Sequence, residues 1–106
     1  MLFVNEHEDA ALDARGCPLV VVKRGADGAL ARSGSGVVEQ AAIPVAAVDA
    51  TGAGDSFDAG FLAAWIGAEP LAGALALGCA CGALSTRALG GTAAQPTLTE
   101  ARAALR

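Results

Sequence analysis

The apolar and polar positions form two patterns along the chain. Up to about residue 45, short apolar runs are separated by glycine-rich turns, whereas from about residue 57 apolar residues recur at helical spacing. The run LVVVK has no polar alternation, which is typical of a strand covered on both faces in a parallel sheet. GADG and SGSG have turn chemistry, and each precedes a short strand. We therefore expect strands at residues 2–4, 19–23, 29–31 and 37–39.

The helical pattern follows the last of these strands. Apolar residues lie at the i, i+4, i+7, i+8 spacing of one helical face, namely Phe57, Phe61, Ala64 and Trp65. This spacing predicts a helix over residues 54–66. A second helix is expected at residues 70–87, with Pro70 in its first turn. A third, capped by Thr97 or Thr99, ends at about residue 105.

A further short helix is expected at residues 6–15, ended by Gly16. Strands followed by helices, with parallel-sheet character, indicate an α/β fold in a single domain over residues 1–106. A parallel sheet needs neighbours for its strands, and this chain opens on the last residues of a strand. We therefore expect it to be the latter part of a larger domain.

Composition and charge exclude some partners. The sequence is 54% hydrophobic but only 4% aromatic, because alanine and glycine are abundant, and this favours closely packed helices. The net charge is −4 and no lysine or arginine run is present. Nucleic acids and anionic membrane surfaces both need clustered positive charge, so we expect neither as a partner. Any phosphate must be held by backbone dipoles, a metal, or single basic residues.

One apolar segment raises the alternative of a membrane span. Residues 59–84 are mostly apolar, and Gly78 and Gly82 form the G-x-x-x-G spacing of membrane helix dimers. Glu69 and Pro70 interrupt the segment, however, and the remaining run LAGALALGCACGAL is shorter than the roughly 20 residues that a span needs. A buried helix is therefore favoured.

The three cysteines do not suggest a disulfide framework. Cys79 and Cys81 are two residues apart in an expected helix, so they point to roughly opposite sides and cannot share a metal there. Small buried thiols, also at Cys17, are the favoured interpretation. The start MLFVNEHED lacks the basic lead and apolar stretch of a secretory signal. A reducing cytoplasm is the expected location.

The glycine-rich stretch DATGAGDSF, residues 49–57, is the main candidate site. A dinucleotide fingerprint needs a small residue where Phe57 stands, and a Walker A loop needs a lysine that is absent. If the loop opens a helix, the backbone N–H groups of residues 52–55 can hold the oxygens of a phosphoryl group in transfer. Asp55 can then accept the proton of the attacking hydroxyl. The alternative is an ordinary acid at a helix N-terminus.

Four segments in order resemble one family. DATGAGDSFDAGFLAAW (residues 49–65) is similar to the signature of the ribokinase, or PfkB, family of carbohydrate kinases, whose usual form is Asp-Thr-Thr-Gly-Ala-Gly-Asp. NEHE (residues 5–8) matches the family's Asn-x-x-Glu motif, and VVVKRGADGAL (residues 20–30) resembles its strand-turn-strand near the nucleotide phosphates. STRALGGTAAQPT (residues 85–97) is similar to the loop before the family's last helix.

The resemblance implies a role for each matching residue. Asp55 would be the catalytic base that also contacts the sugar hydroxyl, and the anion hole would be formed by Gly52, Ala53 and Gly54. The ATP-binding residues would be Asn5, Lys23, Gly25, Asp27, Gly28 and Cys79. Asn5 and Glu8 would organise Mg²⁺, and Asp49 with the Thr51 carbonyl would bind a monovalent cation, K⁺. ATP and Mg²⁺ are thus the implied cofactors, and a small sugar-like alcohol is the implied substrate.

Ordinary structural roles remain open for several of these residues. Asn5 and Glu8 can belong to a solvated helical face, Lys23 can be an exposed residue at a strand end, and Asp49 can form a turn. Two positions depart from the family pattern. Ala50 replaces the usual threonine, and Cys79 stands where several relatives have asparagine near the adenine, so that contact would be apolar.

The largest departure is length, because family members are much longer. The resemblance covers only their C-terminal, nucleotide-binding part, and the N-terminal half and lid are missing. We therefore expect a truncated sugar kinase with little or no activity by itself, because positioning dominates phosphoryl transfer. The alternative is a non-catalytic nucleotide-binding module. Its exposed sheet edge would pair with a second copy or with a complementing N-terminal half.

Overall fold

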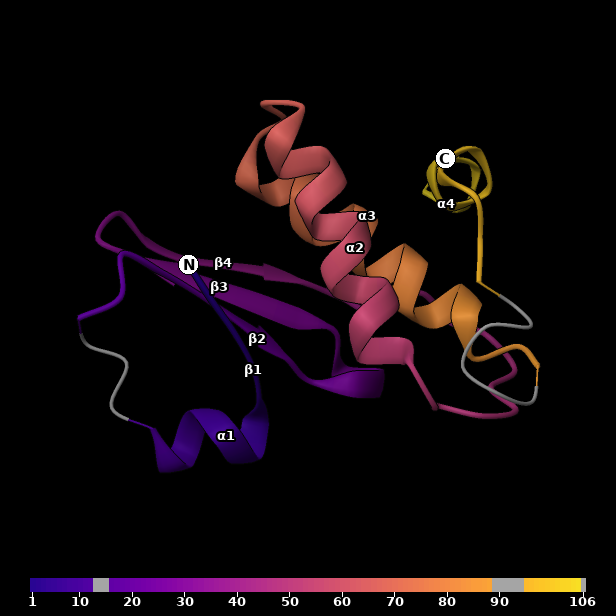
Figure 1. Ribbon diagram of the computed structural model, residues 1–106, viewed down its shortest axis with the longest axis horizontal. Helices are drawn as coiled ribbons and strands as arrows, with labels where there is room; N and C mark the ends of the chain where they lie inside the picture. The colour runs from indigo at the N-terminus through magenta and orange to yellow at the C-terminus, as the bar shows by residue number, and fades with distance from the viewer. Residues whose placement is uncertain (13–15, 89–94, 106) are drawn as a thin grey trace.

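The computed structural model describes residues 1–12, 16–88 and 95–105, which form a four-stranded sheet with helices packed on it (Figure 1). The strands are β1 (Leu2–Asn5), β2 (Leu19–Lys23), β3 (Ala29–Ser33) and β4 (Gly36–Gln40). The helices are α1 (Glu6–Ala11), α2 (Ala53–Ile66), α3 (Leu71–Ser85) and α4 (Leu98–Ala104), and a 3-10 turn covers Gly25–Asp27. The α/β class is confirmed.

The sheet is mixed rather than parallel throughout. Its order is β1-β2-β3-β4, with β1 and β2 parallel and the other two pairs antiparallel. The parallel pair is joined through α1, whereas short turns join β2 to β3 and β3 to β4. A short turn can only reverse the chain, since a parallel pair needs a longer crossover. The parallel character read from LVVVK therefore applies to one side of β2 only.

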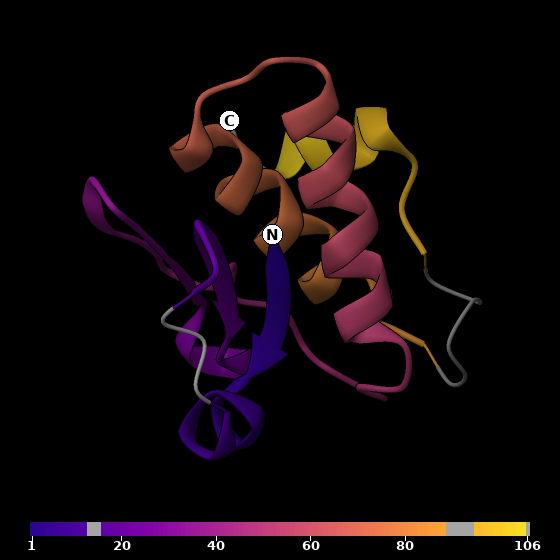
Figure 2. The same cartoon turned by 60° about the vertical axis from the view of Figure 1, so that its left-hand side comes forward.

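The apolar run of β2 is buried on both faces, as expected. Leu19 and Val21 belong to the main core, together with the buried faces of α2 and α3. Val20 and Val22, which alternate with them, form a smaller cluster with Val4 on the other face. In Figure 2, α2 and α3 lie together on one side of the sheet and α1 lies away from them.

Small residues let α2 and α3 approach closely. A Cβ on Gly78 would lie 3.0 Å from the ring of Phe57, and one on Gly60 would lie 2.6 Å from Sγ of Cys81. The G-x-x-x-G spacing at Gly78 and Gly82 thus serves packing inside this molecule. Among the described residues, no helix has the length and apolar character needed to span a bilayer.

Element boundaries differ from expectation at a few helix ends. Helix α1 ends at Ala11 with Leu12 as its C-cap, so it is shorter than expected, and residues 13–15 lie outside the described part. Helix α3 ends at Ser85 rather than at residue 87. Thr97, not Thr99, caps α4, and the glycine pair at 90–91 also lies outside the described residues.

Candidate functional site

The glycine loop opens α2 in the way that the sequence predicts. Gly52 is the N-cap and has φ +76°, a left-handed conformation that glycine adopts without strain. Within the described part of the chain, no side chain caps this end of α2. The first-turn N–H groups of a helix have no intrahelical partner, so the loop presents amides rather than a capping side chain. The Ala53 N–H is already used, because it donates to the Ala50 carbonyl at 3.1 Å.

Asp55 lies in the first turn of α2 and is exposed. Its neighbour Gly54 is exposed as well, whereas Ser56 and Phe57 point into the core. The carboxylate is therefore open to solvent beside the glycine loop, where a small molecule can reach it. Such access is necessary for a general base, and the catalytic role of Asp55 stays a prediction.

The sheet brings two more predicted residues to the same place. Asn5 and Lys23 are register partners at the carboxyl ends of the parallel strands β1 and β2. Lys23 Nζ is 3.4 Å from the position that a Cβ on Gly54 would occupy, so the lysine reaches the glycine loop. The same Nζ lies 3.1 Å from Oδ1 of Asp58. Strand ends and the start of α2 thus converge, as at ligand sites of parallel sheets.

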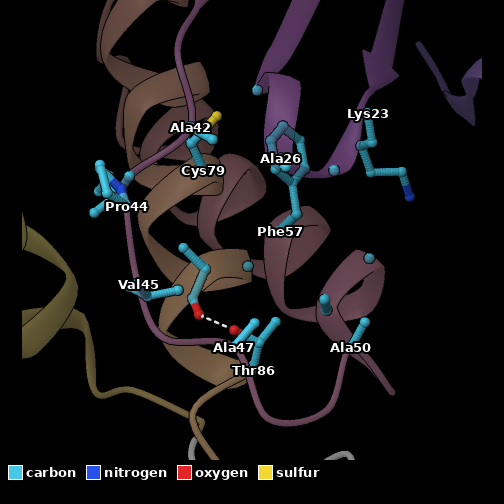
Figure 3. A pocket seen from close by; sticks show the side chains of 17 residues that line it. Lys23, Ala26, Ala42, Pro44, Val45, Ala47, Ala50, Phe57, Cys79 and Thr86 are labelled. Atoms are coloured by element: carbon cyan, nitrogen blue, oxygen red, sulfur yellow. Dashed lines mark hydrogen bonds between the residues drawn. The ribbon is translucent and has the colours of Figure 1, made fainter.

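A cavity of about 470 Å³ extends from this point (Figure 3). Six of the site residues predicted from the sequence line this cavity, namely Lys23, Gly25, Gly28, Ala53, Gly54 and Cys79. Other predicted site residues do not line it, namely Asn5, Glu8, Asp27, Asp49, Thr51, Gly52 and Asp55. The cavity therefore joins the turn after β2 to the glycine loop and to α3, but not to every predicted position.

Much of the cavity wall was not identified from the sequence. The segment between β4 and α2 supplies Ile43, Pro44 and Val45, and the end of α3 supplies Thr86. The hydroxyl of Thr86 donates to the Ala83 carbonyl at 2.6 Å. The available signal in the sequence is an apolar stretch without helical or strand periodicity, since ligand pockets are lined mainly by hydrophobic side chains.

Cys79 forms an apolar part of this wall. It is 6% exposed, and burial raises the pKa of its thiol to about 11. Cys81, also buried, has its thiol pKa raised by burial. Both thiols are therefore neutral near pH 7, and the interpretation of these two cysteines as small buried thiols is confirmed. Cys17 is only partly buried, so the expectation for it was wrong.

Asn5 and Glu8 form a capping box at the start of α1. The Asn5 side chain accepts from the Glu8 N–H at 2.8 Å, and Oε1 of Glu8 accepts from the Asn5 N–H at 2.9 Å. Both residues are exposed, and the described residues hold no cluster of three or more metal-ligating side chains. The second oxygen of Glu8 still suits Mg²⁺, which keeps several waters and often binds only one or two protein carboxylates. The donor set fits a water-rich magnesium site.

Asp49 and Thr51 make a tight turn before the glycine loop. Oδ1 of Asp49 accepts from the Thr51 N–H at 2.9 Å and from its hydroxyl at 2.6 Å. The N–H groups of Val48 and Asp49 donate to the Thr86 carbonyl, which ties this turn to the end of α3. The turn-forming role of Asp49 is thus present, and the potassium site stays a prediction.

The comparisons with known proteins identify the family of this chain. Residues 3–98 match the model of the family described as pfkB family carbohydrate kinase. The chain belongs to this family. Fructoselysine 6-kinase of Escherichia coli strain K12 is 45% identical over 73 residues, which are 69% of this chain and 28% of the relative. This pfkB-family chain thus spans less than a third of that relative's length.

Two solved structures extend the family match to the fold. An E. coli protein described as a ribokinase II, in complex with ATP and Mg²⁺, is 28% identical with a TM-score of 0.88. The match covers 98% of the pfkB-family chain and 38% of the ribokinase II chain. Aminoimidazole riboside kinase of Salmonella enterica, complexed with aminoimidazole riboside and an ATP analog, is 32% identical with a TM-score of 0.86. The match covers 99% of the pfkB-family chain and 42% of the riboside kinase chain.

Proposed function

We propose that the chain supplies the nucleotide-binding and phosphoryl-transfer part of an ATP-dependent kinase acting on a hydroxyl of a sugar or sugar-like alcohol. One observation carries the proposal. The uncapped start of α2, the Lys23 ammonium and the exposed Asp55 gather at one end of a cavity that Gly54 lines. The amides that would hold an anion are therefore next to a carboxylate that would accept a proton.

The nucleotide would occupy the cavity with its phosphates toward the glycine loop. Gly25 and Gly28 border the cavity at the turn after β2. Nothing lies within 4 Å of a Cβ position on Gly25, so the lack of a side chain there permits close approach of a ligand. Cys79 would contribute an apolar surface to the base. Asp27 is exposed in the 3-10 turn, and we propose that it faces the ribose from the cavity's rim. The solved relative holding ATP and Mg²⁺ supports this assignment.

The transfer step would use the two sides of the glycine loop differently. The amides of Gly52, Ala53 and Gly54 would hold the phosphoryl oxygens, with the Ala53 N–H released from Ala50 or shared. Asp55 would accept the proton from the acceptor hydroxyl as its oxygen forms the bond to phosphorus. Charge repulsion stays low because a neutral hydroxyl lies between the carboxylate and the phosphate.

The residues identified above would hold the metal ions that assist phosphoryl transfer. Mg²⁺, held through Glu8 and Asn5 with waters, would neutralise phosphate charge when bound. We keep K⁺ at Asp49 and the Thr51 carbonyl as part of the proposal.

The three free cysteines and the proposed use of ATP favour a reducing cytoplasm as the location of the protein.

The test is a measurement of ATP binding and of product formation by the 106-residue chain. We expect ATP to bind, and a coupled ATP-consumption assay over a panel of sugars to show little or no turnover. The chain spans 28% of the fructoselysine kinase, and orientation of the acceptor supplies much of the catalysis. Robust turnover would contradict the expectation for the chain alone.

Asp55→Asn tests the base directly. With protein in excess over sugar, mass spectrometry detects product from a single turnover, and Asn at position 55 should lower its rate about 10²- to 10⁴-fold while ATP binding persists. If ATP binds tightly but neither protein forms a sugar phosphate, the non-catalytic nucleotide-binding alternative is favoured. Sedimentation of the chain then shows whether it also self-associates.

A further inference from the structure

An ion pair fixes the ammonium of Lys23 at the glycine loop. Its Nζ lies 3.1 Å from Oδ1 and 3.3 Å from Oδ2 of Asp58, in the second turn of α2. The two side chains are only 21% and 29% exposed. The Cβ position of Gly54 is 3.4 Å from the same Nζ. The ammonium is therefore held by an acid of α2 close to the backbone expected to bind phosphate.

We propose that Asp58 is a positioning residue, which orients the Lys23 ammonium to donate to the phosphate chain of a nucleotide at the glycine loop. The inference rests on the proposed function, since it requires phosphates at Gly54. An ammonium has three N–H donors, and the single carboxylate of Asp58 leaves donors for a second partner. Lys23 can thus contact both groups at once.

The benefit of Asp58 comes from holding the lysine in place beforehand. A lysine side chain loses much rotamer entropy when it is fixed in one conformation. Because Asp58 already restrains Lys23, less of this side-chain entropy is lost when the nucleotide binds. Asp58→Asn keeps the shape of the side chain but weakens this restraint.

The charge of Asp58 acts in the opposite direction. A carboxylate close to phosphates repels them unless a cation compensates it, and here the Lys23 ammonium contacts Asp58 and lies near Gly54. Without Lys23 the same carboxylate would be uncompensated and would oppose phosphate binding. Asp58 should therefore strengthen phosphate binding when Lys23 is present and weaken it when Lys23 is absent.

A double-mutant cycle tests this dependence by isothermal titration calorimetry with ATP. In the natural background, Asp58→Asn should weaken ATP binding about three- to tenfold, whereas beside Lys23→Met it should strengthen binding by a similar factor. Asp58→Glu should restore most of the affinity lost with Asn. Adenosine has no phosphate, so its affinity should be unchanged in every variant.

Glu69→Gln is the matched control. It removes a carboxylate from another ion pair on this chain, with Arg102 at 3.0 Å, and neither residue lines the cavity. ATP affinity should not change. Asp58→Ser is a shortened variant that should weaken ATP binding as Asp58→Asn does, and circular dichroism verifies that each variant is folded.

Three outcomes would overturn the inference or its basis, and they are distinguishable. A change of the same sign in both backgrounds would exclude positioning through Lys23. A parallel loss of adenosine binding would show that Asp58 maintains the cavity rather than the ammonium. If the natural chain binds ATP no more tightly than adenosine, the proposed phosphate site itself fails.

Discussion

Gly28 shows how one residue shapes the cavity. Its φ is +87°, and a Cβ there would lie 2.0 Å from the backbone carbonyl oxygen of Gln40. The sequence predicts a turn at this position, but only the structure shows that β4 passes directly against it. Gly28 thus lets the turn after β2 and the segment after β4 meet at the cavity wall.

Gly28→Ala should therefore be strongly destabilising. We expect the free energy of unfolding to fall by at least about 2 kcal/mol, because the strained φ and a clash with backbone add together. Urea denaturation followed by circular dichroism measures the change. Gly34→Ala is the control, since nothing lies within 4 Å of a Cβ at Gly34, and its effect should stay within about 0.5 kcal/mol. Equal effects at the two positions would refute the clash.

The start of helix α1 combines an observed capping role with a proposed magnesium-binding role. Its six residues start at the capping box of Asn5 and Glu8, and an isolated helix of this length is unstable in water. The family resemblance gives the same two residues a magnesium role. The capping bonds were not predicted, although an asparagine followed three residues later by glutamate resembles the capping-box signal.

Glu8→Gln separates the two roles. Glutamine can still accept the Asn5 N–H, so the free energy of unfolding should stay within about 0.5 kcal/mol of the natural value. It lacks the charge that Mg²⁺ prefers, so the strengthening of ATP binding by Mg²⁺ should decrease severalfold. Titrations of ATP with and without Mg²⁺ measure this. An unchanged magnesium effect would assign Glu8 to capping alone.

Ion pairs connect the separate elements of the whole molecule. Asp9 of α1 pairs with Arg32 of β3, and Glu69 after α2 makes two hydrogen bonds with Arg102 of α4. The hydrogen bonds from Arg32 hold the pKa of Asp9 below its ordinary value, and those from Arg102 do the same to the pKa of Glu69. The small helices α1 and α4 are thus attached by charged contacts as well as by packing.

The lowered pKa values predict that acid destabilises the fold. A carboxyl group with a lowered pKa in the folded state stabilises it above its unfolded pKa, and this contribution is lost as pH falls through the folded value. The free energy of unfolding should therefore decrease as pH falls below about 5 and through the lowered pKa values of Asp9 and Glu69. Glu69→Gln should be less sensitive over this range, because glutamine does not titrate. Equal pH dependence of the two proteins would show that the Arg102 contact contributes nothing.

The sequence by itself determined the elements and the family. Local signals were sufficient for this, because an unbroken apolar run, glycine turns and i, i+4 spacing each act over a few residues. Each of the four motifs is also short, and together in order they indicated the family. The match over residues 3–98 confirms the family. The start of α2 was predicted within one residue, since the glycine loop signals its own boundary.

Only the tertiary structure decided which residues meet. Lys23 and Asp58 are 35 residues apart, and their contact depends on how α2 crosses the end of β2. The cavity wall at residues 43–45 and the approach of Gly28 to Gln40 likewise depend on packing between distant segments. Spacing along a chain carries no information on such contacts, because they arise when separate elements bury their apolar faces together.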